Sequence, residues 1–151
     1  MKLYIAGPWV DRDAVNVEAQ KFRDAGHTVD CRWLTLHTEV GQSSGDALNQ
    51  DEHQEFLREQ ALNDIEDLLN SELLVLINSA KSEGKAVETG IAITALIPII
   101  LIGKRSNIFH TLNIPIFATS EEAIVWIAEQ VRMAQEIVLE VAAASATTMV
   151  Q

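Results

Sequence analysis

The chain has 151 residues, a net charge of −11 and a single cysteine, Cys31. This length suits one domain. The excess of acidic residues excludes a nucleic-acid polymer as partner, because such a partner needs a basic surface. A single cysteine excludes an internal disulfide and a cysteine-rich metal site. No apolar run reaches the roughly 20 residues that span a bilayer, and the N-terminal segment is strand-like rather than a signal peptide, so we expect a cytoplasmic protein without a membrane partner.

Strands and helices are predicted to alternate along the whole chain. Short apolar runs predict strands at residues 2–6, 27–34, 71–78, 97–102 and 114–118. Apolar residues at helical spacing predict helices at residues 11–25, 51–70, 85–96, 106–112 and 120–144, the last one with Ser120 as N-cap. This alternation predicts an α/β fold: one doubly wound, flavodoxin- or Rossmann-like parallel sheet of about five strands, with helices on both faces.

Two segments fall outside this pattern. Residues 35–50 have no clear period and read as a long loop, which we expect to shape a binding pocket. Residues 145–151 read as a flexible tail behind a single domain of residues 1–144. Because ligands of open α/β sheets bind at the carboxyl ends of the strands, residues 7–9, 78–84 and 103–107 are expected to converge on the site.

Glu88 is the most informative residue of the sequence. It lies in a helix that is otherwise apolar nearly all round (Ala-Val-Glu-Thr-Gly-Ile-Ala-Ile), and a carboxylate there is costly unless it is hydrogen-bonded or has a raised pKa. Such a cost is tolerated mainly where the carboxylate acts in catalysis. Gly90 would let a ring or a backbone approach closely. The alternative is that Glu88 points outward or makes a structural pair.

Three further residues are candidates from their positions. Asp64 and Asp67 are three apart, so both can lie on one side of their helix; the alternative is a solvated acidic face, since Glu59 and Glu66 are nearby. The apolar stripe of this helix is predicted to consist of Leu57, Ala61, Ile65 and Leu69. Tyr4 could hold a carboxylate by a hydrogen bond or be an ordinary core tyrosine. Ser82 and the free N–H groups after it could bind an anion, or Ser82 could simply cap the helix.

Several site classes are excluded by motif. The chain has no P-loop, no Gly-x-Gly-x-x-Gly and no Gly-x-Ser-x-Gly elbow. Its four histidines show no metal-ligand spacing, so we predict no metal site and no cofactor. A nucleotide substrate would be small, with its phosphate held by backbone N–H groups and hydroxyls; the simpler interpretation of the acidity is that it keeps the protein soluble.

The last helix carries apolar residues on more than one face. Ile124, Ile127, Val131, Ala134 and Val138 form one stripe, and Trp126, Met133 and Ile137 lie largely outside it. A second apolar face is usually buried against something. A homo-oligomer is the natural candidate, and the alternative is that the same chain covers it.

Three segments together resemble the nucleoside 2-deoxyribosyltransferase family and its nucleotide-hydrolysing relatives. They are Lys-Leu-Tyr-Ile-Ala-Gly-Pro at residues 2–8, the segment from Asp64 through the strand that ends at Asn78, and Ser82-x-Gly84-x-x-x-Glu88-x-Gly90. Residues 103–110 also match a stretch that in relatives reaches a neighbouring subunit's site. The similarity covers roughly residues 1–127 in order.

The resemblance implies a role for each matching residue. Glu88 would be the nucleophile on the anomeric carbon of a nucleoside or nucleotide, Asp64 the acid that protonates the leaving base, and Tyr4 the residue that orients Glu88. Substrate-binding residues would be Gly7, Pro8, Trp9, Ser82, Gly84, Asn107 and His110. The chain also departs from the family's pattern. Pro8 and Trp9 follow Gly7, where nucleotide-hydrolysing relatives tend to have a hydroxyl that helps hold the phosphate, and Glu72 stands where many relatives have Asp just before the strand.

Three functions stay open at this point. One is base exchange between deoxyribonucleosides, in a homo-oligomer with shared active sites. The second is hydrolysis of nucleoside 5′-monophosphates on the same scaffold. The third is a catalytically inactive nucleotide-binding module.

Overall fold

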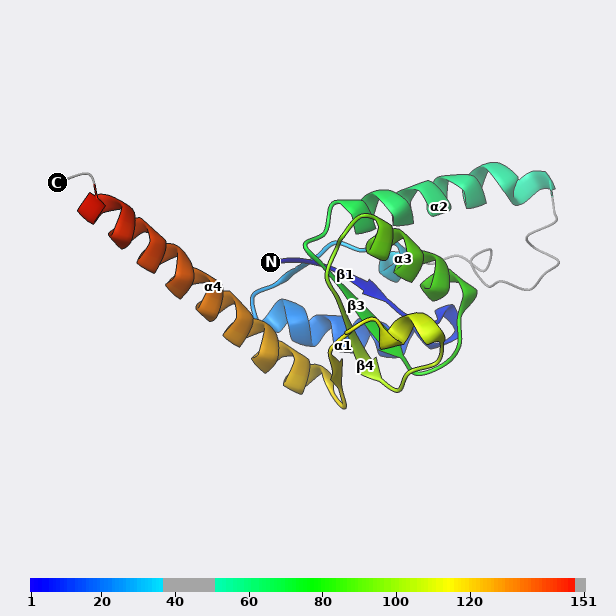
Figure 1. Cartoon of the computed structure of the whole chain (residues 1–151). Coiled ribbons are helices and arrows are strands. Elements are labelled where there is room, and N and C mark those ends of the chain that lie inside the picture. The colour runs from blue at the N-terminus through cyan, green and yellow to red at the C-terminus, as the bar shows by residue number, and fades with distance from the viewer. Residues whose placement is uncertain (37–50, 149–151) are drawn as a thin grey trace.

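A five-stranded parallel sheet forms the centre of the molecule (Figure 1). The computed structural model describes residues 1–36 and 51–148. The strands are β1 (Lys2–Ala6), β2 (Thr28–Val29), β3 (Leu73–Asn78), β4 (Ile99–Gly103) and β5 (Ile116–Phe117). Their order is β2-β1-β3-β4-β5 and every neighbouring pair is parallel. This is the flavodoxin-like doubly wound order, so the predicted fold class is confirmed.

Helices cover both faces of the sheet. The α-helices are α1 (Arg12–Asp24), α2 (Gln54–Leu69), α3 (Glu83–Thr94) and α4 (Ser120–Thr148), and the 3-10 turns are η1 (Trp9–Asp11), η2 (Arg32–Thr35), η5 (Asp51–His53) and η6 (Ile108–Thr111). Helices α2 and α3 contact each other on one face, while α1 and α4 contact each other on the other. In the described part of the chain, no helix combines the length and apolar character needed to cross a bilayer.

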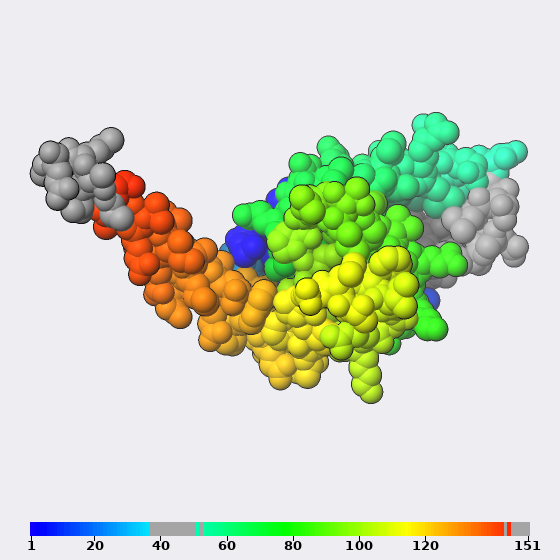
Figure 2. All heavy atoms as spheres, viewed as in Figure 1, coloured from blue at the N-terminus to red at the C-terminus, as the bar shows by residue number. Residues whose placement is uncertain are grey.

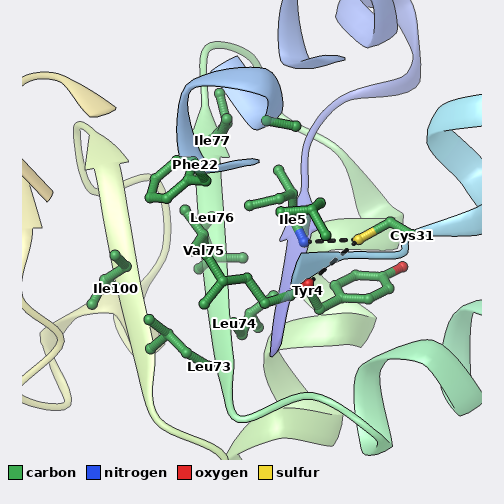
Figure 3. Packing of buried hydrophobic residues seen from close by; sticks show 14 of the residues in the cluster. Tyr4, Ile5, Phe22, Cys31, Leu73, Leu74, Val75, Leu76, Ile77 and Ile100 are labelled. Atoms are coloured by element: carbon green, nitrogen blue, oxygen red, sulfur yellow. Dashed lines mark hydrogen bonds between the residues drawn. The ribbon is translucent and has the colours of Figure 1, made fainter. Parts of the chain in front are cut away.

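The core lies between the central strands and the helices. Strands β1 and β3 are buried over almost their whole length, and Phe22 of α1 packs on the same core (Figure 3). Cys31 is also buried there; its sulfur accepts a hydrogen bond from the backbone N–H of Ile5 at 3.1 Å. Burial raises the pKa of the Cys31 thiol to about 12, so it stays protonated and serves as a packing residue.

The predicted strand at residues 27–34 is wrong beyond its first few residues. Only Thr28 and Val29 pair with β1, and the chain then turns into η2. Two long-range contacts account for this: the Trp33 indole donates to the carbonyl of Ile5, and Arg32 binds Asp67 on α2. The predicted loop after it lies outside the described residues except for its first two positions.

The core stripe predicted for α2 is also wrong. Ile65 and Leu69 are exposed, and Leu68 is the buried residue of the helix. Since Asp64 lies one turn before Leu68, the Asp64 side of α2 faces the sheet. The acidic residue that looked solvent-exposed by pattern therefore points inward.

Helix α4 differs from its prediction at both ends. The hydroxyl of Thr119, not that of Ser120, accepts the N-terminal hydrogen bond, from the N–H of Glu122. Ser120 instead is buried and donates to Glu18 of α1. The helix continues to Thr148, four residues beyond the predicted end, and residues 149–151 of the predicted tail lie outside the described residues.

Candidate active site

Tyr4, Glu88 and Asp64 come together between the sheet and the helices on its α2–α3 face. Tyr4 lies in the middle of β1 and is fully buried, and its hydroxyl donates to Oε1 of Glu88 at 2.7 Å. Glu88 occupies the second turn of α3 and is half-buried. Asp64 reaches the same space from α2, close enough for its charge to act on both partners. The structure thus joins three residues that are far apart in the sequence.

The two carboxyls have raised proton affinities for the same main reason. The pKa of Glu88 is raised to about 7, chiefly by burial; the charge of Asp64 also raises it, while the hydrogen bond from Tyr4 and the charge of Lys85 lower it. Burial also raises the pKa of Asp64 to about 6, with Asp67 adding to the shift and Arg32 opposing it. Both carboxyls therefore change charge near neutral pH, which is the range in which an acid or a base is most useful to an enzyme.

Tyr4 stays a hydrogen-bond donor. Burial and the nearby carboxylates raise the pKa of its phenol well above the ordinary value. A protonated hydroxyl held by β1 fixes one oxygen of Glu88, and Oε2 has no hydrogen bond within the described residues. The arrangement orients a carboxylate and leaves one of its oxygens available.

Asp67 has a different role from Asp64. It accepts hydrogen bonds from the backbone N–H and the Nε of Arg32, both at 2.9 Å. Arg32 also binds the side chain of Asn63 and that of Glu66. This network fastens α2 to η2 and so sets where Asp64 stands. The role of Arg32 was not predicted from the sequence, because its partners on α2 lie more than 30 positions away and no local sequence pattern connects them.

Lys85 is a second buried charge on α3, one turn before Glu88. It is 5 % exposed, and its ammonium donates to the carbonyls of Ile77 and Ala80 and to Oδ1 of Asn78. Asn78 in turn donates to the Lys104 carbonyl and to the Ser106 hydroxyl. Lys85 thereby ties together the carboxyl ends of β3 and β4. The burial of Lys85 could have been inferred from the sequence in one way: a lysine three residues before Glu88 lies on the same face of an apolar helix as Glu88.

A polar pocket of about 410 Å³ opens at these strand ends. Its lining includes Asn78, Ser82, Lys85, Asn107 and His110. The Ser82 hydroxyl accepts a hydrogen bond from the Lys85 N–H, so the predicted capping is present. The pocket contains the start of α3, where free N–H groups and the helix dipole favour an anion.

His110 and Asn107, expected to bind substrate, also hold their own loop together. His110 is buried; its Nδ1 accepts from the Ser106 N–H, and its Nε2 faces the Asn107 amide. Asn107 accepts from the backbone N–H groups of Phe109 and His110. Burial lowers the pKa of His110, and the nearby charges of Lys85 and Arg105 add to this, so the ring is neutral at pH 7.

The turn after β1 requires its glycine. A Cβ on Gly7 would lie 2.5 Å from Cγ2 of Val15, so only glycine lets α1 pack this close to the turn. Pro8 is buried, and the half-buried ring of Trp9 lies 6.3 Å from that of Trp33, with Arg12 over its face. Trp9 and Trp33 form an aromatic wall beside the strand that carries Tyr4.

The two other predicted glycines both lie on α3. A Cβ on Gly84 would lie 3.6 Å from the hydroxyl oxygen of Ser82, an ordinary contact, and Gly90 has no close neighbour within the described residues. A Cβ on Gly90 would meet nothing within 4 Å, so no close approach to Gly90 is found in the part of the chain that the structure describes. Gly90 instead lines an open apolar groove of about 510 Å³ with Leu69, Val87 and Ile91. Leu62 and Ile65 are exposed beside it on α2.

The comparisons with known proteins support the fold. No protein-family model and no curated protein matches the chain. Among solved structures it is similar to a 2-deoxyribosyltransferase from Bacillus psychrosaccharolyticus, with 22% identity, a TM-score of 0.61 and coverage of 82% of this chain and 90% of that one. It is also similar to a conserved protein from Enterococcus faecalis V583, with 17% identity, a TM-score of 0.63 and coverage of 86% and 98%. At these identities the likeness establishes a shared fold.

Proposed function

We propose that the protein cleaves the N-glycosidic bond of deoxyribonucleosides and transfers the sugar to a second base. The observation that carries this proposal is the trio of Tyr4, Glu88 and Asp64: a carboxylate on α3 oriented by a tyrosine hydroxyl, with a second carboxyl of raised pKa near it. The neighbour of the same fold from Bacillus psychrosaccharolyticus is a 2-deoxyribosyltransferase, and the resemblance of the sequence motifs points to the same chemistry.

In the first step, an oxygen of ionised Glu88 attacks the anomeric carbon of the sugar. The bond from that carbon to the base nitrogen breaks, and an ester bond to Glu88 forms. Asp64 gives its proton to the leaving base, because a neutral base leaves far more easily than an anion. In the second step, a nitrogen of the incoming base attacks the same carbon, the ester bond breaks, and Asp64 takes the proton of the incoming base.

Tyr4 keeps Glu88 in place through both steps. Its hydrogen bond stabilises the ionised form of Glu88 before attack, and it can follow the oxygen as the ester forms.

The proposed roles require a narrow pH optimum. Glu88, with a pKa of about 7, must be ionised, so activity falls as the pH drops below it. Asp64, with a pKa of about 6, must be protonated, so activity falls as the pH rises above it. Because the two carboxyls interact, the two apparent pKa values of the pH–activity profile describe the pair rather than either residue alone. We expect a bell-shaped profile of kcat/KM with its maximum between about 6 and about 7.

A second candidate is hydrolysis of nucleoside 5′-monophosphates. The observation that favours it is the polar pocket at the start of α3, which contains Ser82 and Lys85 and suits a phosphate. Chromatography of reactions with deoxyribonucleosides and with their 5′-monophosphates, each with and without a second base, separates the two. A new nucleoside formed only with the second base establishes the transferase. Base released from the monophosphates alone would establish the hydrolase instead of the transferase. No base released from any substrate would contradict both functions and favour a nucleotide-binding module.

We further expect a homo-oligomer whose active sites are shared. The apolar groove around Gly90 lies on the turn of α3 that follows Glu88, so a second copy seated there would stand close to the site. This expectation is tested by the mass of the enzyme in solution and by loss of activity on dissociation.

A further inference from the structure

Helix α4 is longer than the body of the domain can cover. Its first half packs on the sheet, where Ala123 and Ile127 are buried and Val131 is half-buried. Every side chain from Arg132 to Ala143 is exposed. Figures 1 and 2 show this second half leaving the body as an isolated rod. We call residues 132–148 of α4 the arm.

The arm carries large apolar side chains in water. Met133, Ile137, Val138, Leu139 and Val141 are between 49% and 69% exposed. An isolated helix of this length is marginal in water even with the best helix formers, and β-branched residues lower its stability further. The arm is therefore expected to stay helical only when another surface covers it.

The apolar residues of α4 follow the spacing of paired helices. Intervals of three and four residues separate the members of one seam: Ile124, Ile127, Val131, Ala134, Val138 and Val141. This alternation is the heptad pattern that places a continuous apolar seam between two helices. The body of the domain covers the first three members, and the last three are exposed along the arm. The seam therefore continues without a break past the point at which its cover ends.

The charged residues of the helix all avoid this seam. Glu129, Arg132, Glu136 and Glu140 lie on its outer side, where Arg132 and Glu136 form an ion pair at 2.7 Å. The positions that flank the exposed seam hold Gln130, Gln135, Ile137 and Ala142, none of them charged. Two copies of the seam can meet without bringing like charges together, and the small Ala134 lets the helices approach closely.

We propose that the arm is a dimerisation element, in which the exposed seam of α4 pairs with the same seam of a second copy of this chain. The same patch on both copies gives a closed, two-fold symmetric contact. A membrane surface fits less well, because the arm carries two glutamates and one arginine, a net negative charge that anionic lipids would repel. This pairing is separate from the proposed chemistry and does not depend on it.

The test is the mass of the full-length protein in solution, measured by sedimentation equilibrium over a range of concentrations. The double variant Val138→Glu/Val141→Glu places charges in the seam, and Leu139→Glu is the matched control, because Leu139 is equally exposed but lies on the outer side. We expect the wild type and the control to associate alike. We expect the double variant to associate at least about 100-fold more weakly, since each pairing would bury unpaired carboxylates.

Three outcomes would overturn the proposal. One is a wild type that is monomeric at every concentration, including the case in which it binds lipid vesicles instead. Another is a double variant that assembles as tightly as the wild type. The third is a control that dissociates as far as the double variant. Because residues 132–143 of the arm are all exposed, the thermal unfolding of the body should be the same in all three proteins, and this confirms that the variants are folded.

Discussion

Two neighbouring turns of α3 each carry a charged side chain, Lys85 buried and Glu88 half-buried, and the two differ in how many hydrogen-bond partners the charge has. The Lys85 ammonium uses three oxygen acceptors from β3 and the turn after it. Among the described residues, the Glu88 carboxylate has one hydrogen bond, from Tyr4, and its pKa is raised to about 7. A charge with all of its partners holds structure in place, whereas a charge with one partner and a free oxygen is available for chemistry.

Of the variants that test this difference between Lys85 and Glu88, Glu88→Ala should lose the most activity. Removing the nucleophile should lower kcat/KM by at least about a thousandfold, with the fold retained in circular dichroism. Glu59→Ala, an exposed glutamate on α2, is the control and should stay within about twofold. Full activity in Glu88→Ala would remove Glu88 from the mechanism.

Asp64→Asn should follow with a loss of about 10²- to 10⁴-fold on ordinary nucleosides, because the leaving base is no longer protonated. The loss should nearly vanish with a 7-methylated purine deoxyribonucleoside, whose base is already cationic and leaves neutral. The ratio of the two rates is the measurement. An equal loss on both substrates would assign Asp64 a structural role instead.

Lys85→Met should lower the stability of the protein more than its catalytic activity. Three oxygens would lose their donor, and we expect the free energy of unfolding to fall by about 2–4 kcal/mol. Lys104→Met, at an exposed lysine, is the matched control and should change it by less than about 0.5 kcal/mol. Urea unfolding of the two variants decides the point, and equal stabilities would show that the Lys85 network contributes nothing.

Glu88→Gln should have the opposite effect on stability, in a defined pH window. The pKa of Glu88 is about 7 in the folded chain against an ordinary 4.5, so its contribution to stability is present below the ordinary value and is lost as the pH rises through about 7. Glutamine does not ionise, so the variant should exceed the wild type by about 1–3 kcal/mol above pH 8. Unfolding across pH 4 to 8 measures the gap, which should widen with pH; a constant gap would contradict the raised pKa.

Tyr4→Phe should have the smallest effect. Loss of one hydrogen bond to the ionised Glu88 is expected to lower kcat/KM at neutral pH by about tenfold. Because that hydrogen bond lowers the pKa of Glu88, which is the higher of the two, its loss should make the alkaline limb of the pH profile begin at a higher pH. A change in rate with no movement of the limb would indicate that Tyr4 acts through packing alone.

The sequence predicted the elements that local pattern determines. The apolar runs of β1 and β3 and the buried acid in α3 stand out without any structure, and the hydrogen bond between Tyr4 and Glu88 is present as expected. The catalytic roles of these residues and the division at residue 144 stay predictions.

The features that the sequence did not predict depend on contacts between residues far apart in the chain. Arg32 and Trp33 end β2 early by binding α2 and β1, and the same contacts turn the Asp64 side of α2 inward. The burial of Lys85 depends on acceptors from β3 and the turn after it, which no helical period reveals.

The most direct test of the central claim is a search for the covalent intermediate on Glu88. The enzyme is mixed with a deoxyribonucleoside without a second base, quenched in acid, digested and analysed by mass spectrometry. The account predicts a deoxyribosyl group on the peptide that contains Glu88, and its loss when a second base is added before the quench. Base exchange that proceeds at full rate with the sugar attached to a different residue would contradict it.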